Sequence, residues 1–340
     1  MGMTAPARSA FRCSILAVLA VSSLLTPALV VARDCPRPPA KPLHYAPNAN
    51  FDSNGKYLPS QAGFGMADVS SVGQLDALGG DVKGLVWVGQ CNGADEKFRK
   101  TVQPYIGNPK LYGFYLMDDP DPRRMLESGK LAVSCTPDNL KAESDWIHHH
   151  APGAKTFIVP MNLSSSKTPS FKDTYNPTNS HVDLFGIDPY PCRTELNGCD
   201  YDMIDRYVLA AEAWGIPRSR MVPVYQSFGG GDWLDDNDGR YLLPTAEQTR
   251  QMLARWKKYV TAPEFDVVYS WGSQRSDAAL EGAPDLQEVF SVHNHASGPL
   301  AKPNCHDAEA VPLDAAKPPA QQAAVPSRDR SRNSPGQPPS

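Results

Sequence analysis

Two adjacent carboxylates end one of the most apolar stretches of the chain. In 111-LYGFYLMDDPDP-122, apolar and aromatic residues run up to Asp118 and Asp119. Successive side chains of a strand alternate, so one aspartate should point inward over the sheet edge while the other turns into the loop. A third aspartate, Asp188, ends the stretch 182-VDLFGIDPY-190 in a similar way. Carboxyl groups in such positions can act as general acid and general base.

Carboxylates or amides also end most of the other apolar stretches. The residues are Asp68, Gln90, Asp118, Asn162, Asp188, Gln226 and Gln274, and the aromatic residues on or just after these ends are Trp87, Tyr190, Trp233 and Trp271. Flat rings can stack on the C–H faces of a sugar while Asp, Asn and Gln bond its hydroxyl groups, so the pattern favours a carbohydrate cleft. The alternatives are polar residues that only mark where a strand leaves the interior, and tryptophans that belong to the core.

Short apolar strands alternate with helix-like stretches from residue 62 onward. The expected strands are 62–69, 83–90, 111–118, 155–162, 182–190, 221–226 and 266–274, and the clearest helices are 138–150, 201–215 and 245–260. Asp138 and Thr245 are expected to cap two of these helices. Near-continuous apolar strands between helices indicate a parallel sheet that is buried on both faces.

Seven strand–helix units of this kind predict an α/β protein with a (β/α)₈ TIM-like barrel. The stretch 42–51 could supply an eighth strand, or the eighth strand could be missing. An open, doubly wound sheet is the rival fold, but no GxGxxG motif follows the first strand, so the sequence gives no indication of dinucleotide binding. In a parallel barrel the strand ends converge on one face, which would bring the polar and aromatic residues together.

Four short motifs resemble strand ends of the glycoside-hydrolase-like (β/α)₈ superfamily: 115-YLMDDP-120, 185-FGIDPYP-191, 223-PVYQSFGG-230 and 269-YSWGSQ-274. The resemblance covers roughly residues 60–290. In retaining members, Asn-Glu-Pro or Asp-Glu-Pro carries the acid/base, a later strand end carries a glutamate nucleophile, and the last carries a sugar-stacking Trp. The resemblance therefore implies that Asp119 is the acid/base and that Trp271 stacks on sugar. Gln226 stands where the nucleophile would be, which departs from the retaining pattern.

We therefore expect a glycoside hydrolase-like protein that acts on or binds a poly- or oligosaccharide, with Asp119 as acid and Asp188 or Asp118 as base. Two strands apart, these sites would have Cα atoms roughly 10 Å apart, with room for a water as in inverting enzymes. The expected substrate-binding residues are Asp68, Trp87, Gln90, Asn162, Tyr190, Gln226, Trp271 and Gln274. The alternative is a non-catalytic carbohydrate-binding or structural barrel, in which the aspartates form a calcium site or a salt-bridged structural pair. The acidic loop 232–241 could also hold calcium, but it misses the EF-hand register, so a solvated loop is favoured there. No cofactor or metal ligand is predicted.

The ends of the chain differ from the barrel in composition. Residues 1–32 have the basic start, short apolar run and small-residue exit of a signal peptide, with an uncleaved membrane anchor as the alternative. Residues 33–60 are expected to be an extended lead-in, 61–300 the barrel domain, and 301–340 a disordered Pro/Ala-rich tail. A secreted or periplasmic protein without stable membrane insertion after signal removal follows from this division.

Charge and cysteine content complete the expectation. Loss of residues 1–32 leaves 31 basic and 37 acidic residues, a net charge of −6, without a basic cluster for nucleic acid. Nucleic-acid binding is therefore not expected. The expected partner is a carbohydrate ligand, and the protein is expected to be a monomer. Six cysteines remain, which an exported chain can pair in three disulfides. The expected pairs are Cys91–Cys135, Cys192–Cys199 and Cys35–Cys305.

Overall fold

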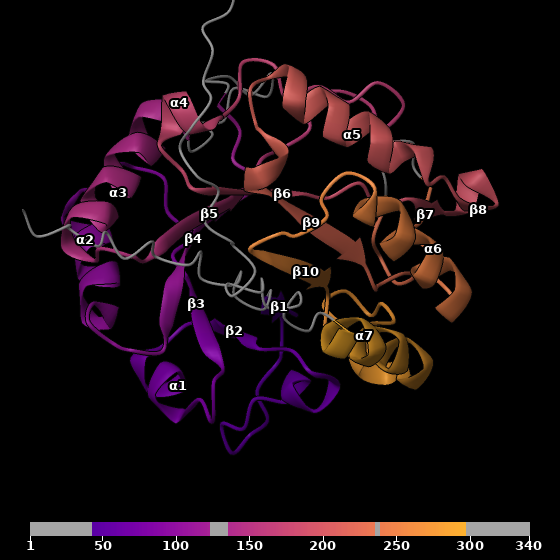
Figure 1. Ribbon diagram of the computed structural model, residues 1–340, viewed down its shortest axis with the longest axis horizontal. Helices are drawn as coiled ribbons and strands as arrows, with labels where there is room; N and C mark the ends of the chain where they lie inside the picture. Colours follow the sequence, from indigo (N-terminus) through magenta and orange to yellow (C-terminus); the bar gives the residue numbers. More distant parts are fainter. Residues whose placement is uncertain (1–42, 123–134, 235–238, 297–340) are drawn as a thin grey trace, which may run out of the picture. The chain divides into compact units, whose positions relative to one another are not determined.

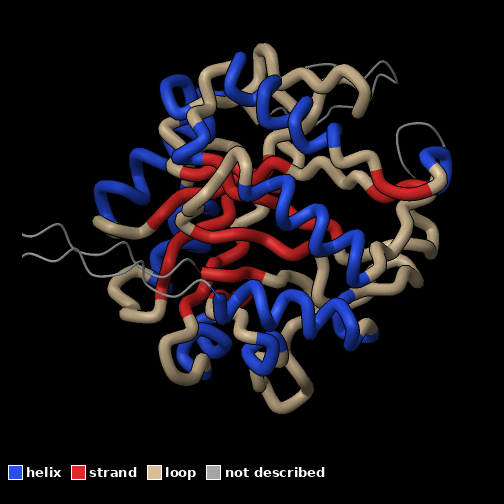
Figure 2. Tube along the Cα trace, turned by 45° about the vertical axis from the view of Figure 1, so that its right-hand side comes forward, coloured by secondary structure: helices blue, strands red, loops and turns tan. Residues whose placement is uncertain are grey.

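The computed structural model describes residues 43–122, 135–234 and 239–296. Eight parallel strands form a closed barrel in the order β1-β10-β9-β6-β5-β4-β3-β2. Their bounds are β1 Leu43–Tyr45, β2 Met66–Val69, β3 Lys83–Trp87, β4 Leu111–Asp118, β5 Lys155–Val159, β6 Leu184–Ile187, β9 Met221–Gln226 and β10 Phe265–Tyr269. Figures 1 and 2 show these strands at the centre with helices around them. The predicted (β/α)₈ barrel is confirmed.

All of the strands expected from residue 62 onward are present, and β1 lies within the stretch 42–51 that was left open as an eighth strand. The barrel therefore begins inside the segment 33–60 that was expected to be only a lead-in. The expected signal peptide and tail lie outside the described residues. Within the described ranges, no helix is both long enough and apolar enough to span a membrane.

Helices connect the strands and cover the outside of the barrel (Figure 1). They are α1 Val72–Ala77, α2 Glu96–Val102, α3 Pro137–His150, α4 Pro177–Ser180, α5 Asp202–Ala213, α6 Ala246–Lys257 and α7 Pro284–Ala296. The Thr245 side chain and Gln248 form a capping box at the start of α6, as expected. The expected cap of α3 is wrong, because Thr136 caps it, Pro137 takes the first helical position and Asp138 lies in the first turn.

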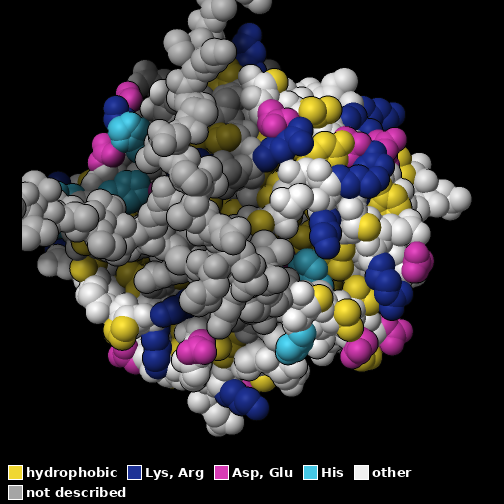
Figure 3. Space-filling view, in the orientation of Figure 1, with side chains coloured by type: hydrophobic (Ala, Val, Ile, Leu, Met, Phe, Trp, Pro, Cys, Tyr) yellow, Lys and Arg dark blue, Asp and Glu magenta, His cyan; other side chains and the backbone are white. Residues whose placement is uncertain are grey.

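The surface of the helical layer carries charges of both signs. Figure 3 shows Lys and Arg side chains interspersed with Asp and Glu on the side of α5 and α6. Several of them are paired; Arg250, for example, lies 3.6 Å from Glu247 on α6, and both side chains are exposed. Such exposed pairs contribute little to stability, so the fold depends on its interior.

Side chains alternate between two apolar cores. Tyr45, Met66, Leu85, Phe157 and Val224 pack together inside the barrel. Their strand neighbours, such as Ala67, Val86 and Ile158, belong to the larger core between strands and helices. This period of two places every second strand residue inside the barrel, and the last inward residue of a strand can therefore face the open end.

A buried His–Asp–His cluster joins the first strand, the last strand and the last helix. His44 Nδ1 lies 2.8 Å from one carboxylate oxygen of Asp266, and His293 Nε2 lies 2.8 Å from the other. His44 and Asp266 are paired residues of β1 and β10, and both are buried. The charge of His44 and the hydrogen bonds of both histidines outweigh burial and lower the pKa of Asp266 to about 2.

We predict that Asp266→Asn lowers the free energy of unfolding by about 3 kcal/mol, because it breaks a buried charged cluster. The lowered pKa gives the sign of the pH dependence: the stabilisation is complete above the ordinary pKa of 3.8 and is lost as the pH falls toward 2. Urea unfolding between pH 2 and pH 7 measures both effects. Glu288→Gln, at an exposed position of α7, is the matched control. Equal stability of Asp266→Asn and parent at pH 7 would contradict the role of the cluster.

Candidate functional site

A cavity of about 370 Å³ opens at the C-terminal ends of the strands. Two of its lining residues are acidic, Asp68 and Asp118, and two are amides, Asn48 and Gln274. The polar aromatic side chains of the lining are Tyr45, Trp87, Tyr115, Tyr190, Trp233 and Tyr269. Pro47 also lines it, and Phe157, Val159, Val224 and Val267 line it where it meets the core inside the barrel. Carboxylates, amides and flat rings around one hollow are the chemistry of a sugar site.

Asp118 and Asp119 occupy the end of β4. The Asp118 carboxylate accepts a hydrogen bond of 2.5 Å from the Tyr115 hydroxyl group. Asp119 has a left-handed backbone with φ of +44°, and its N–H donates to the Val159 carbonyl at 3.0 Å. This turn ends the strand while β5 still holds it, so both aspartate side chains remain exposed at the rim. Asp118 lines the cavity, whereas Asp119 lies beside it in sequence without being part of the lining.

Asp68 and Asp188 come from two other strand ends. Asp68 is the last residue of β2 that points into the barrel. Its carboxylate accepts a hydrogen bond from the Asn48 N–H at 3.4 Å. Asp188 directly follows β6 and is half-buried. β5 lies between β4 and β6 in the barrel, so Asp188 stands two strands from Asp118, as predicted. Asp188 is not part of the cavity lining. The expectation that Asp119 and Asp188 are far enough apart to hold a water between them, as in an inverting enzyme, stays a prediction.

The four carboxyl groups hold their protons more tightly than ordinary aspartates. Desolvation by surrounding protein atoms and then the charge of Asp118 raise the pKa of Asp119 to about 7, although its side chain is exposed by surface area. Desolvation, followed by the charges of Asp119 and Asp118, raises the pKa of Asp188 well above its ordinary value. Desolvation by surrounding protein atoms also raises the pKa of Asp68 and Asp118. The charge of Asp118 raises the pKa of Asp119, and the charges of both raise the pKa of Asp188. The three carboxyl groups therefore interact electrostatically.

The cavity contains some of the expected binding residues and several that sequence reasoning missed. Asp68, Trp87, Tyr190 and Gln274 line it. Tyr45, Asn48, Tyr115 and Tyr269 line it too, although none was expected. The alternation of β4 and β10 would have pointed Tyr115 and Tyr269 inward, but each could also have belonged to the core. Tyr45 offered no such signal, because β1 is only three residues long. Asn48 offered no indication, because its backbone has a left-handed φ of +72° in a loop.

Four of the expected binding residues do not line the cavity. The Gln90 amide donates to Thr101 Oγ1 on α2 at 2.9 Å, so it faces the helical layer. Asn162 braces its own loop, accepting from the N–H groups of Ser164 and Ser170. Trp271 is 2% exposed and packs edge-on against Phe64 in the outer core, so the structure places this Trp away from the position of a sugar-stacking ring.

Gln226 is also absent from the lining, for a more specific reason. Its side chain is fully buried and its Oε1 accepts from the Cys192 N–H at 2.9 Å. Its Nε2 donates to the carbonyl groups of Cys192, Leu242 and Phe228 at 3.0, 2.9 and 3.3 Å. An amide is needed at this position because one atom must accept while the other donates. The residue at the expected nucleophile position therefore braces two loops.

Two of the expected disulfides are confirmed. Cys91 bonds Cys135, joining the loops after β3 and β4, and Cys192 bonds Cys199 across the small hairpin of β7 Cys192–Arg193 and β8 Gly198–Cys199. Both hold loops at the rim where the aspartates stand. Cys35 and Cys305 lie outside the described residues.

Among the described residues, one group has the composition and spacing to hold a metal ion: His44, Asp266 and His293, whose possible ligand atoms lie within 4.8 Å of one another. None of the three lines the cavity. Both carboxylate oxygens are already engaged by the histidines, so we interpret the group as the structural cluster described above. The aspartates of the cavity form no such group in the described part of the chain.

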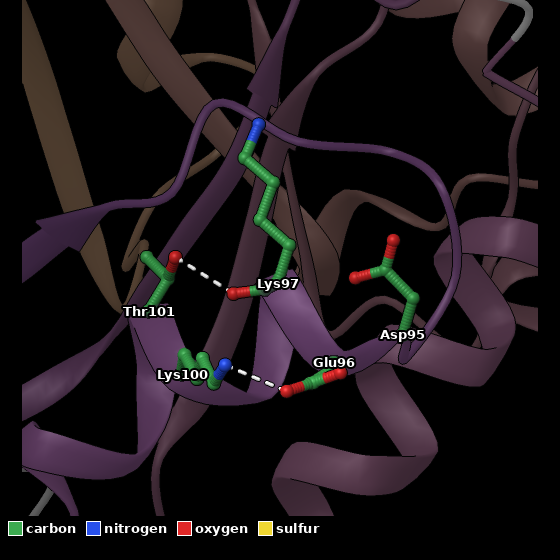
Figure 4. A pocket seen from close by; sticks show the side chains of 5 residues that line it. All are labelled: Asp95, Glu96, Lys97, Lys100 and Thr101. Atoms are coloured by element: carbon green, nitrogen blue, oxygen red, sulfur yellow. Dashed lines mark hydrogen bonds and ion pairs between the residues drawn. The ribbon is translucent and has the colours of Figure 1, made fainter.

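A second hollow, of about 630 Å³, lies on the surface of α2 (Figure 4). Its residues are mostly exposed, and Lys100 pairs with Glu96 along the helix itself at 2.6 Å. No aromatic ring or buried polar group belongs to its lining. We assign it no function.

The sequence matches no protein-family model and no curated protein. Solved structures resemble about three quarters of the chain. The C-terminal domain of a putative chitinase from Desulfitobacterium hafniense has 9% identity, covers 74% of this chain and 99% of its own, and gives a TM-score of 0.48. A chitinase-like agglutinin from Robinia pseudoacacia has 12% identity, with 75% and 99% covered and a TM-score of 0.46.

A plant class V chitinase mutant from Cycas revoluta, in complex with (GlcNAc)₃, has 11% identity, with 74% and 99% covered and a TM-score of 0.46. The expectation of a glycoside-hydrolase-like (β/α)₈ fold is confirmed at the level of the fold, by the closed barrel of this chain. Identities and TM-scores this low leave the chemistry of the site to be argued from its own residues.

We predict that Gln226→Glu destabilises the protein by roughly 3 kcal/mol or more and does not increase glycoside hydrolysis, because a carboxylate would face three carbonyl oxygens in a buried place. Chemical unfolding and a reducing-sugar assay measure the two outcomes. Gln61→Glu, at an exposed position, is the matched control. A folded Gln226→Glu variant with increased turnover would instead show that this barrel lacks only its nucleophile.

Proposed function

We propose that the chain hydrolyses glycosidic bonds of an oligo- or polysaccharide bound in the cavity. The observation that carries the proposal is the group of interacting aspartates with raised pKa values at the strand ends, next to an aromatic-lined hollow. Perturbed carboxyl groups in a cleft are typical of acid–base catalysis, and the rings offer stacking surfaces for sugar. An export signal and disulfides would suit an enzyme that meets its glycan outside the cell.

In this proposal Asp119 is the general acid. A pKa of about 7 keeps much of the group protonated near neutrality, ready to protonate the glycosidic oxygen as the bond to the anomeric carbon breaks. Asp118 is the favoured base, since it lines the cavity and the Tyr115 hydroxyl group stabilises its ionised form. It would take the proton of the water that attacks the anomeric carbon. Asp188 is the second candidate for the base, although its more strongly raised pKa makes it a poorer proton acceptor at neutral pH.

A non-catalytic carbohydrate-binding barrel is the alternative function. The observation in its favour is Gln226, which occupies the expected nucleophile position with an amide. Binding of an oligosaccharide without release of reducing ends, by a folded preparation, would favour this alternative.

We predict that Asp119→Asn lowers turnover at least 100-fold, because the amide cannot donate a proton as an acid does. The same variant should be at least as stable as the parent at pH 8, because a raised carboxyl pKa costs stability above the ordinary pKa. Reducing-sugar release and thermal unfolding test both parts. Asp81→Asn is the matched control, on an exposed turn before β3, at the opposite end of the strand. Loss of stability together with retained activity would assign Asp119 a structural role.

The pH dependence gives a further prediction. Turnover at saturating substrate should fall as the pH rises through about 7, because the protonated form of Asp119 disappears there. A pH–rate profile from pH 5 to pH 9 measures this limb. In Asp118→Asn the residual activity should fall at a lower pH, because the charge that helps to raise the pKa of Asp119 is gone. A profile that is flat to pH 9 in the parent would exclude Asp119 as the acid.

A further inference from the structure

The cavity carries acidic residues without basic ones among its described lining residues. Asp68 and Asp118 face it, and the lining contains no Lys, Arg or His. Asp119 and Asp188 lie close by, since both interact electrostatically with the same group of residues. Carboxylates removed from water are generally paired with a cation or a strong donor. Hydroxyl and amide groups of Tyr115 and Asn48 supply hydrogen bonds here, but they supply no positive charge.

Asp68 has no role in the proposed acid–base mechanism. It stands at the end of β2, where hydrogen bonds from Tyr45 and from the Asn48 N–H hold its carboxylate at the cavity wall. The Asn48 contact is long, at 3.4 Å, so it compensates the carboxylate only weakly. A carboxylate in this position is suited to a positively charged group of the ligand.

The basic side chains near the cavity are engaged elsewhere. Arg193 is buried, donates to the Tyr190 carbonyl at 2.9 Å and lies 5.1 Å from the ring of Tyr241, and its charge acts on Asp188. Arg275 lies 4.5 Å from the ring of Trp233. Neither belongs to the cavity lining. Among the described residues, the charge balance around Asp68 and Asp118 is therefore left to the ligand.

The aromatic wall favours the same kind of ligand. Trp87 and Tyr115 meet edge-on at 4.9 Å, and both line the cavity beside Asp118. An ammonium group is attracted to the face of such rings as well as to carboxylates, whereas a uronic acid would be repelled by both. An uncharged sugar would use the rings but not the charges.

We propose that the cavity binds a sugar with a free amino group, so that the substrate class is a cationic oligomer of 2-amino-2-deoxyhexoses. This inference rests on the proposed function for the claim that the cavity binds sugar, but it does not depend on hydrolysis. The ammonium group lies against Asp68 and Asp118, and the ring stacks on the aromatic wall. N-acetylation removes the positive charge and with it the attraction to both carboxylates.

Tryptophan fluorescence tests the proposal, because Trp87 and Trp233 both line the cavity. The protein without its expected signal peptide, residues 1–32, is titrated with three kinds of oligomer of equal length. These are glucosamine and galactosamine oligomers, their fully N-acetylated forms, and uronic acid oligomers. We expect at least one amino-sugar series to bind roughly tenfold or more tightly than its N-acetylated form, and the uronic acids to bind most weakly. Raising the salt from 50 to 500 mM should reduce the preference in part, since salt screens charge pairs and partly buried pairs are screened less than exposed ones. Equal binding of free and N-acetylated oligomers would overturn the inference.

Asp68→Asn sharpens the test. The amide keeps one acceptor oxygen for the Asn48 N–H and replaces the other carboxylate oxygen with an NH2 group. Because the charge is lost, the variant should lose severalfold more affinity for the amino-sugar oligomer than for its N-acetylated form. Asp81→Asn should leave both affinities unchanged. An equal loss for both ligands would assign Asp68 a structural role and overturn the inference. If Asp68→Asn does not fold, the ligand preference of the parent and its salt dependence decide alone.

The outcome for hydrolysis is separate. Preferential binding of amino-sugar oligomers without release of reducing ends supports this inference and contradicts the proposed function. Hydrolysis of neutral oligomers without any preference for the amino form supports the proposed function and contradicts this inference. Failure of every oligomer to bind the folded protein contradicts both.

Discussion

The pairing of β1 with β10 is the contact on which the cavity depends, because it closes the sheet into a barrel. β1 is only three residues long and pairs with Phe265–Val267 of β10, more than 200 residues away along the chain. The closure places Tyr45 beside Val267 and brings the loop after β1 against the loop after β10, where the Trp271 N–H bonds the Pro47 carbonyl at 2.9 Å. Without this seam, the wall formed by Tyr45, Asn48 and Tyr269 would not exist. The buried cluster of His44, Asp266 and His293 lies on the outer side of the same seam and ties it to α7.

Desolvated aspartates have pKa values shifted in opposite directions at the outer seam of the barrel and at the ends of its strands. Asp266 is fully desolvated, yet its pKa is lowered because two histidines compensate its charge. Asp119 and Asp188 are desolvated with further carboxylates nearby, so their pKa values are raised. The first arrangement stabilises the fold at neutral pH and the second costs stability there. A stability cost that is concentrated at an open cavity indicates a binding or catalytic purpose more than a structural one.

The sequence predicted the fold better than it predicted the site. Strand and helix periodicity indicated the barrel, because a period of two and a period of 3.6 are local properties. It also indicated Asp68, Asp118 and Asp188 as strand ends. It did not separate Trp87, which lines the cavity, from Trp271, which packs in the outer core, because both are tryptophans near a strand end. Tyr45 and Asn48 depended on β1, whose three residues are too few for any periodicity to be visible.

Gln226 shows where such prediction stops. Its strand position and polarity suited a ligand contact, and the resemblance to retaining enzymes made it the place of a missing nucleophile. The loops that contain Cys192 and Leu242 cover it instead and use both ends of its amide. Phe228, two residues further on, packs against Tyr190, Trp233 and Tyr269. The end of β9 thus supports the aromatic wall, while the acids come from other strands.

Those acids come from β2, β4 and β6, the second, fourth and sixth strands of the barrel in chain order. In a (β/α)₈ barrel, the inward side chains of alternate strands share one layer, because the strands are tilted and staggered. Asp68, Asp118 and Asp188 therefore belong to one set of strands, with Asp119 next to the middle one. Carboxyl groups that act on one another across such a layer do not all ionise together near neutral pH, so at least one keeps its proton. Under the proposed function, this barrel geometry would provide an acid in its reactive form, without a basic side chain from the described cavity lining to balance the remaining charge.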